Sequence, residues 1–171
     1  NLGNGTFADQ TAQAGIQRPG GDWPQGSWVD YDNDGWLDLF LTTYETNALY
    51  RSRGDGTFQF VDVGNLRTDG DRVSSSAWGD FDGDGFPDIL LPCGDTVATR
   101  NHLYRGGTNG NHWLKVRLVG TTSNRDGIGA KVRVRATLGG RTFWQLREVS
   151  GNSAPGGAQQ LLPHFGLGNS T

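Results

Sequence analysis

Two nine-residue segments with the same spacing of aspartates constrain this chain more than any other feature of its sequence. Residues 30–38 read D-Y-D-N-D-G-W-L-D and residues 80–88 read D-F-D-G-D-G-F-P-D. The two segments are offset by 50 residues, and their aspartates fall at positions 1, 3, 5 and 9 of each. Such internal similarity predicts two copies of one structural unit.

The spacing of these aspartates predicts a bound cation in each segment. Four carboxylates so close together repel one another, and a surface turn without an ion gains nothing from them. Ligand sets made only of oxygen favour Ca²⁺, which accepts about six to eight oxygens in a flexible shell, whereas Mg²⁺ requires a rigid octahedron. We therefore expect two Ca²⁺ ions, each with a backbone carbonyl at position 7 as a further ligand. The predicted ligands are Asp30, Asp32, Asp34, Trp36 and Asp38 in one segment and Asp80, Asp82, Asp84, Phe86 and Asp88 in the other.

These segments differ from the calcium loop of an EF-hand. They share a glycine at position 6, Gly35 or Gly85, which permits a sharp turn. An EF-hand also needs a glutamate at position 12 and a helix on each side. Position 12 is Leu41 in the first segment and Leu91 in the second, and the flanking residues are typical of strands. The EF-hand interpretation is therefore rejected.

The residues around the two segments predict β-strands. The chain has 28 glycines and 11% aromatic residues, which suits short strands joined by tight turns. No stretch sustains the apolar period of an amphipathic helix. The predicted strands are 26–29, 37–43, 48–51 and 57–63 around the first segment and 75–78, 88–91 and 102–105 around the second. A repeat of this length, with about four strands in each unit, is typical of propeller blades.

The pattern changes after residue 106. Apolar and polar residues alternate over 113–119 and 130–136, and 142–149 is a third predicted strand. Alternation indicates sheets with one buried face, as in an antiparallel sandwich. We therefore predict an all-β chain, with propeller-type blade repeats over residues 1–106 and a β-sandwich-like module over residues 107–171.

Three motifs in the first part resemble the FG-GAP/VCBS repeat family, whose blades build integrin-α-like β-propellers. They are G-x-G-T-F at 3–7 and 54–58, the aspartate segments, and N-x-L-Y-R at 47–51 and 101–105. The resemblance implies that each aspartate segment joins two strands of a blade and holds Ca²⁺. The second part resembles the ASPIC/UnbV module. That resemblance rests on N-H-W-L at 111–114, S-N-R-D-G-I-G-A at 123–130, R-E-V-S-G at 147–151 and H-F-G-L-G at 164–168.

Two blades are fewer than the four or more that close a propeller. Open sheet edges expose unpaired backbone groups that invite further pairing. Three interpretations stay open: a fragment of a larger protein, a closed ring of copies, and head-to-tail addition into a filament.

Charge and motifs argue against several classes of function. Eight of the 18 acidic residues lie in the two segments, and two divalent ions would change the net charge from −3 to +1. A strong field for nucleic acid is therefore not expected. No apolar run is long enough to span a membrane. His102, His112 and His164 form no zinc motif, and no nucleophile or phosphate-cradling motif is present, so we predict that the chain is not an enzyme.

The predicted function is a calcium-binding extracellular scaffold or adhesion protein whose partner is itself or another protein. The alternative is a carbohydrate-binding or carbohydrate-degrading accessory domain, because aromatic faces pack on sugar rings. Trp23, Trp36 and Trp144 are the candidates for a glycan contact, whereas Trp28 and Trp78 occupy equivalent repeat positions and are expected in the core.

Two further predictions concern single residues. The sequences that begin at Asn4 and Asn169 match the N-glycosylation pattern, which has force only in a secreted glycoprotein. Cys93 is the single cysteine and is expected to be buried and unreactive.

Overall fold

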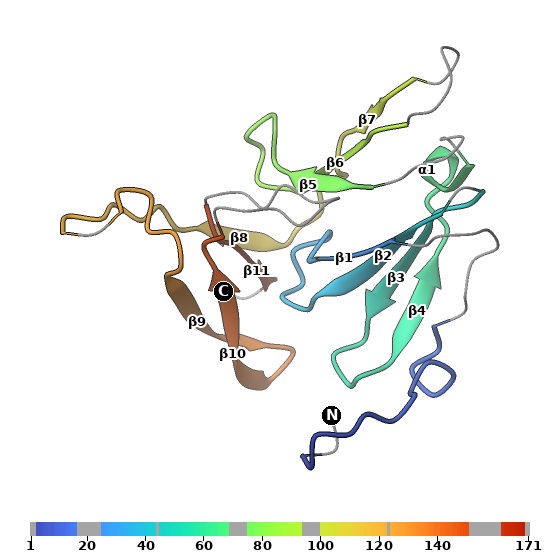
Figure 1. Cartoon of the computed structure of the whole chain (residues 1–171), viewed down its shortest axis with the longest axis horizontal. Helices are drawn as coiled ribbons and strands as arrows, with labels where there is room; N and C mark the ends of the chain where they lie inside the picture. Colours follow the sequence, from blue (N-terminus) through green and yellow to red (C-terminus); the bar gives the residue numbers. More distant parts are fainter. Residues whose placement is uncertain are drawn as a thin grey trace.

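The computed structural model describes residues 3–16, 25–43, 45–68, 75–93, 100–122, 124–150 and 162–169. Within these ranges the chain forms eleven strands and one short helix. The strands make four antiparallel sheets (Figure 1). The predicted all-β fold is confirmed. No helix in these ranges is long and apolar enough to cross a membrane.

The first blade is a four-stranded sheet in which each strand pairs with the next one along the chain. Its strands are β1 (Gln25–Val29), β2 (Asp38–Thr42), β3 (Ala48–Ser52) and β4 (Phe58–Val61). The central strands β2 and β3 are the most buried, which fits their apolar sequences. A one-turn helix, α1 (Asn65–Thr68), follows and was not predicted.

The second blade repeats this arrangement over its described residues. Its strands are β5 (Ala77–Gly79), β6 (Asp88–Leu91) and β7 (His102–Tyr104), in the order β5-β6-β7. Trp78 pairs with Ile89 as Trp28 pairs with Leu39, so the two sheets have the same register.

The repeat extends to the turn made by G-x-G-T-F. The side-chain oxygen of Asn4 accepts hydrogen bonds from the backbone N–H and hydroxyl of Thr6, and that of Asp55 accepts the same pair from Thr57. Glycosylation of Asn4, which is exposed, stays a prediction.

The main core lies between the two blades. It consists of Phe40, Leu49, Ile89, Leu91 and Cys93, which are all buried. The ring of Trp78 packs edge-on against Phe40, with ring centroids 5.4 Å apart. One face of the first blade therefore packs on the tryptophan-bearing face of the second. The expected burial of Cys93 is confirmed.

Trp28 departs from its predicted place in the core. It is 59% exposed, although the equivalent Trp78 packs against the core. The prediction is wrong for Trp28 because its face of the first blade points away from the second blade. That face carries a smaller cluster of Leu39, Ala48 and Tyr50, partly covered by Ile16 and Phe58.

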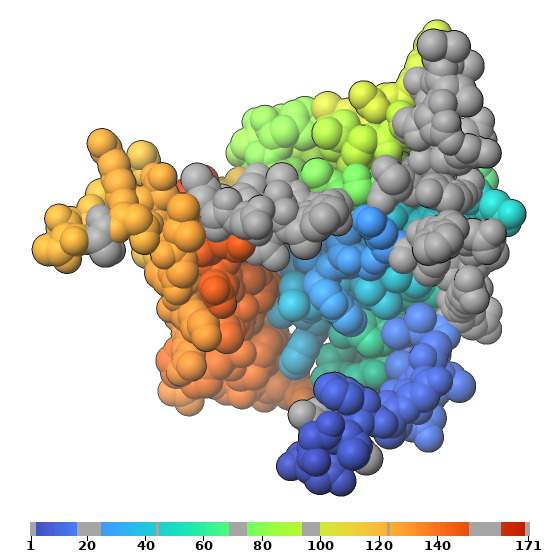
Figure 2. All heavy atoms as spheres, in the orientation of Figure 1, coloured from blue at the N-terminus to red at the C-terminus, as the bar shows by residue number. Residues whose placement is uncertain are grey.

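The C-terminal module contains two two-stranded sheets. One pairs β9 (Lys131–Leu138) with β10 (Arg141–Glu148), and the other pairs β8 (His112–Lys115) with β11 (His164–Gly168). The strand β11 was not predicted, because its two glycines are unfavourable in a strand interior. The space-filling view shows this module, in orange and red, against the blue and cyan first blade (Figure 2).

Candidate metal centre

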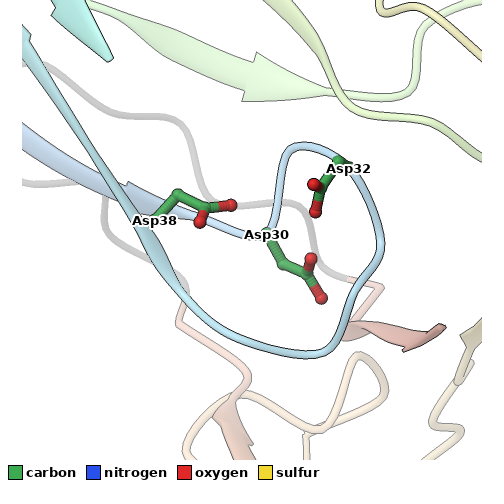
Figure 3. Close-up of side chains that lie close together, drawn as sticks. All are labelled: Asp30, Asp32 and Asp38. Atoms are coloured by element: carbon green, nitrogen blue, oxygen red, sulfur yellow. The ribbon is translucent and has the colours of Figure 1, made fainter. Parts of the chain in front are cut away.

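Loop 1 (residues 30–38) joins β1 to β2 and gathers three carboxylates. Asp30 follows the end of β1, Asp38 begins β2, and Asp32 lies in the turn between them (Figure 3). One oxygen from each lies within 4.8 Å of the others. Gly35 has a φ of 92°, a conformation that favours glycine, as the sequence predicted.

Backbone N–H groups and an arginine fix two of these carboxylates. Both oxygens of Asp38 accept hydrogen bonds, from the N–H of Ser52 at 2.8 Å and of Tyr31 at 3.2 Å. Asp32 Oδ1 accepts from the N–H of Asp34, and Asp32 Oδ2 lies 2.7 Å from Arg51 Nε. These contacts hold the two groups at the edge of the loop.

Asp30 is the carboxylate of loop 1 with a buried oxygen that accepts no hydrogen bond in the described structure. The residue is only 4% exposed. Its Oδ2 accepts from the N–H of Gly35 at 3.0 Å and of Gly166 at 3.1 Å. Its Oδ1 is buried and has no hydrogen-bond donor in the described structure. A buried charged oxygen without a partner is unfavourable, and a hard cation bound by Asp30, Asp32 and Asp38 would supply that partner. The donor set therefore fits Ca²⁺.

The electrostatics of loop 1 point the same way. Burial raises the pKa of Asp30 well above its usual value, and the charges of Asp34 and Asp38 raise it further. Burial also raises the pKa of Asp38 to about 7 and raises that of Asp32. Full ionisation of the loop at neutral pH therefore requires a compensating positive charge.

Loop 2 (residues 80–88) repeats the same construction. Asp80, Asp82 and Asp88 form its group of three carboxylates. Asp88 accepts from the N–H of Gly106 at 2.7 Å and of Phe81 at 2.9 Å, the counterparts of the two bonds to Asp38.

The arginine of each N-x-L-Y-R motif forms ion pairs with the aspartates at positions 3 and 5 of its loop. Arg51 contacts Asp32 and Asp34 at 2.7 and 2.8 Å. Arg105 contacts Asp82 and Asp84 at 2.6 and 2.8 Å. Neither arginine belongs to the predicted ligand set, although the recurrence of both in register is a usable signal in the sequence. The carboxylates at position 5 lie outside the two groups of three, and they also accept from the N–H of position 7. Calcium ligation by Asp34, Asp84 and the carbonyls of Trp36 and Phe86 stays a prediction.

The two loops differ at position 4, which is Asn33 in loop 1 and Gly83 in loop 2. Asn33 is fully buried and has a φ of 59°, which is uncommon for a residue other than glycine. Its Nδ2 donates to the carbonyl of Gly85 at 2.9 Å, and its Oδ1 accepts from His164 Nε2 at 2.7 Å. Burial lowers the pKa of His164 to about 4, so the ring is neutral and acts as a donor through this nitrogen.

The C-terminal module reaches both loops. Gly168 N–H donates to the carbonyl of Asn33 at 2.8 Å, and the side chains of Asn109 and Asn111 both donate to the carbonyl of Asp32. The strand β8 approaches loop 2, where Lys115 Nζ contacts Asp80 Oδ2. None of these contacts was foreseen from the sequence, because each depends on how the module packs on the blades.

The tryptophans proposed for a glycan contact lie in different settings. Trp36 stacks on Phe143 with centroids 4.1 Å apart, and the guanidinium of Arg141 lies 5.4 Å from its ring centroid. Trp144 is 63% exposed. Trp23 lies outside the described residues. Glycan binding therefore stays a prediction.

The fold and site define a class: an all-β repeat chain with an acidic cation loop in each repeat, followed by a separate β module. Comparison with protein families identifies its parts. The family of FG-GAP-like repeats matches residues 30–91, and the family described as ASPIC and UnbV matches residues 120–171. The chain thus contains an FG-GAP-like repeat followed by an ASPIC/UnbV module. Comparison with curated proteins finds no significant match. The family matches do not fix the boundary near residue 106, which stays a prediction.

Proposed function

We propose that the chain binds one structural Ca²⁺ ion in loop 1 and one in loop 2, as part of an extracellular scaffold or adhesion protein without catalytic activity. The FG-GAP-like repeat and the ASPIC/UnbV module suggest an extracellular repeat or adhesion-type protein. The observation that carries the calcium assignment is the buried, unpartnered Oδ1 of Asp30 beside Asp32 and Asp38. The matching group of Asp80, Asp82 and Asp88 supports a second ion.

Isothermal titration calorimetry of the purified chain with CaCl₂ tests this proposal. We expect two Ca²⁺ ions per chain, with Asp30→Asn removing one of them. A folded chain that takes up no Ca²⁺ at millimolar concentration would overturn the calcium assignment. Asp62→Asn, at an exposed aspartate outside both loops, is the matched control and should leave the titration unchanged.

The exposed apolar faces of the two blades support self-assembly of such a scaffold. In the core between the blades, the face of the first blade with Phe40 and Leu49 packs on the face of the second with Trp78. The same two kinds of face recur on the outside. Leu90 and Leu103, which pair across β6 and β7, are 39% and 56% exposed at positions equivalent to Phe40 and Leu49.

The other outer face carries Trp28, the counterpart of Trp78. A second copy of the chain can therefore present its Trp28 face to the Leu90 and Leu103 face of the first and repeat the contact found between the blades. Because the two faces differ, the contact is heterologous and adds copies head to tail.

Sedimentation velocity over a range of concentrations tests this assembly. We expect species larger than the 18.5 kDa chain and a return to monomer in Leu103→Asp. Val119→Asp, which changes an exposed apolar residue outside the blade faces, should leave the assembly intact. A wild-type chain that stays monomeric at every concentration would contradict head-to-tail assembly and leave the calcium proposal untouched.

A further inference from the structure

The first aspartate of each loop has a different second partner. Asp30 Oδ2 accepts from Gly35 N–H and from the backbone of Gly166 in β11. Asp80 Oδ2 accepts from Gly85 N–H and from the ammonium of Lys115 in β8. At equivalent positions the C-terminal module therefore places a neutral amide beside loop 1 and a full positive charge beside loop 2.

We propose that Lys115 is a tethered counter-ion that competes with Ca²⁺ for loop 2, so that the two loops fill in order, loop 1 at lower Ca²⁺ concentration than loop 2. This inference rests on the proposed function, because it assumes that both loops bind the ion. It makes the ion in loop 1 a permanent structural one and the ion in loop 2 one that responds to Ca²⁺ concentration.

The remaining hydrogen bonds of the two aspartates support this difference. Asp30 Oδ1 has no partner in the described structure, so an incoming ion displaces nothing from it. Asp80 Oδ1 already accepts from Gly83 N–H at 2.7 Å. Both oxygens of Asp80 are thus engaged before any ion binds, and one of them is engaged by a charge.

The surroundings of Lys115 hold its ammonium in place. The lysine side chain is 20% exposed and that of Asp80 is 1% exposed, so water screens the pair weakly. The ammonium also lies 5.3 Å from the ring centroid of Trp113, and that ring packs against Gly85. Trp113 therefore fixes β8 to loop 2 and keeps the lysine over the first aspartate.

Among the described residues, no other cation contacts the first aspartate of loop 1 in this way. Arg51 and Arg105 occupy equivalent places, so they affect the two loops equally. Arg147 is the cation of the C-terminal module whose charge acts on Asp30. Its Nη1 donates to the carbonyl of Leu146, and its guanidinium lies 5.3 Å from the ring centroid of Phe165. Its charge therefore acts on Asp30 from a distance, without an ion pair to that carboxylate in the described structure, whereas Lys115 contacts Asp80 directly.

The consequence for binding follows from charge balance. Each loop carries four aspartates and one contacting arginine, and within the described structure only loop 2 has a second cation, Lys115, in direct contact. An ion that enters loop 2 must displace the ammonium from Asp80 or accept its repulsion, and either lowers the affinity. The lysine stem is flexible, so the ammonium can move into water without unfolding β8.

Calcium titration of the full chain by calorimetry, with Tb³⁺ luminescence as a second readout, tests the inference. In the wild type we expect two separated affinities, the tighter removed by Asp30→Asn and the weaker by Asp80→Asn. Lys115→Met keeps the stem over Trp113 and removes the charge, so it should tighten the weaker site by about tenfold or more and leave the tighter one unchanged. Lys131→Met, at an exposed lysine in β9, is the matched control and should change neither affinity.

Two outcomes would overturn this inference without contradicting calcium binding. One is equal affinities of the two loops in the wild type. The other is a loop 2 affinity in Lys115→Met that equals the wild-type value while loop 1 binds normally. Circular dichroism checks the fold of each variant. If Lys115→Met does not fold, Lys115→Gln replaces it, with the same expectation. Absence of Ca²⁺ uptake in the wild type and all variants would overturn the proposed calcium function itself, and is thus distinguishable from failure of the inference.

Discussion

The side-chain amide of Asn33 donates a hydrogen bond of 2.9 Å to the carbonyl of Gly85, which ties loop 1 directly to loop 2. The same side chain accepts from His164 in the C-terminal module. A single buried amide therefore joins the first blade, the second blade and the module. Loop 2 has a glycine at the corresponding position, so this junction exists in only one of the two loops.

Asn33→Gly should destabilise the folded chain by about 2 kcal/mol, because it leaves the buried carbonyl of Gly85 and the ring of His164 without their partner. Glycine keeps the positive φ of this position, so the effect measures the side-chain bonds and not backbone strain. Urea denaturation followed by circular dichroism gives the change in the free energy of unfolding. Asn4→Gly, at an exposed asparagine, is the control, and equal stability of the two variants would contradict the bridging role.

Gly166→Ala should destabilise the chain by about 2–4 kcal/mol, because a Cβ at this position collides with Asp30 Oδ2 and lies 2.6 Å from the backbone of Asn33. The strain falls on a predicted calcium ligand, so Ca²⁺ affinity should fall as well. Gly107→Ala adds a methyl group in open space and should change stability by less than about 0.5 kcal/mol. Matching melting temperatures for the two variants would show that β11 does not approach loop 1 this closely.

Removal of calcium should lower the melting temperature. An ion present at about 100 times its dissociation constant stabilises the fold by about 2.7 kcal/mol. For a chain of this size that corresponds to about 5–10 °C. Differential scanning calorimetry in EDTA, and then with excess Ca²⁺ or Mg²⁺, measures it. We expect Ca²⁺ to restore the melting temperature and Mg²⁺ to restore it poorly. A melting temperature that EDTA leaves unchanged would argue against a structural ion.

Without calcium, the carboxylates of loop 1 should stabilise the chain as the pH falls from 7.5 to 5.5, whereas His164, whose pKa burial lowers to about 4, opposes this change below about pH 6.5. Burial raises the pKa of Asp38 from 3.8 to about 7 in the folded chain, and that of Asp30 is also raised. Between the unfolded and folded values, the folded chain binds more protons than the unfolded one, so stability is lost as pH rises through about 7. The part due to Asp38 is read as the difference in melting temperature between the wild type and Asp38→Asn, which in EDTA should shift in favour of the wild type by about 5 °C between pH 7.5 and pH 5.5.

Saturating Ca²⁺ should weaken or reverse this pH dependence, because the ion binds the ionised carboxylates and competes with protons. Asp38→Asn, which does not titrate at this position, is the matched variant. Acidification in EDTA should raise the melting temperature of the wild type relative to that of this variant. A difference between the two that does not change with pH would contradict the raised pKa of Asp38.

The parts of the fold that follow from local pattern were predictable. The strand 88–91 was predicted to the residue, and the other strands of the blades differ by one to three residues at their ends. The three carboxylates of each group come from the predicted ligand set. All of these depend on turn chemistry and alternation within short stretches, which a sequence displays directly.

The parts that depend on packing between distant segments were not predictable. Trp28 and Trp78 occupy equivalent positions of the repeat, yet within the described structure only Trp78 packs against another blade. Neither Lys115 nor Gly166 lies in a recognisable ligand motif, and each meets a loop only because β8 and β11 pack against it. Asn33 is unremarkable as a turn residue, and its bonds to His164 and Gly85 arise from tertiary structure alone.

The bond between Gly166 and Asp30 spans 136 residues of sequence. Loop 1 precedes β11 in the chain, so its environment is complete only after β11 has been synthesised. Contacts of such long range slow folding, because the intervening chain must first be ordered. Until β11 is in place, Asp30 lacks the hydrogen bond from Gly166. The surroundings of the first loop are therefore assembled from both ends of the described chain, and loss of β11 would alter a loop that lies far from it in sequence.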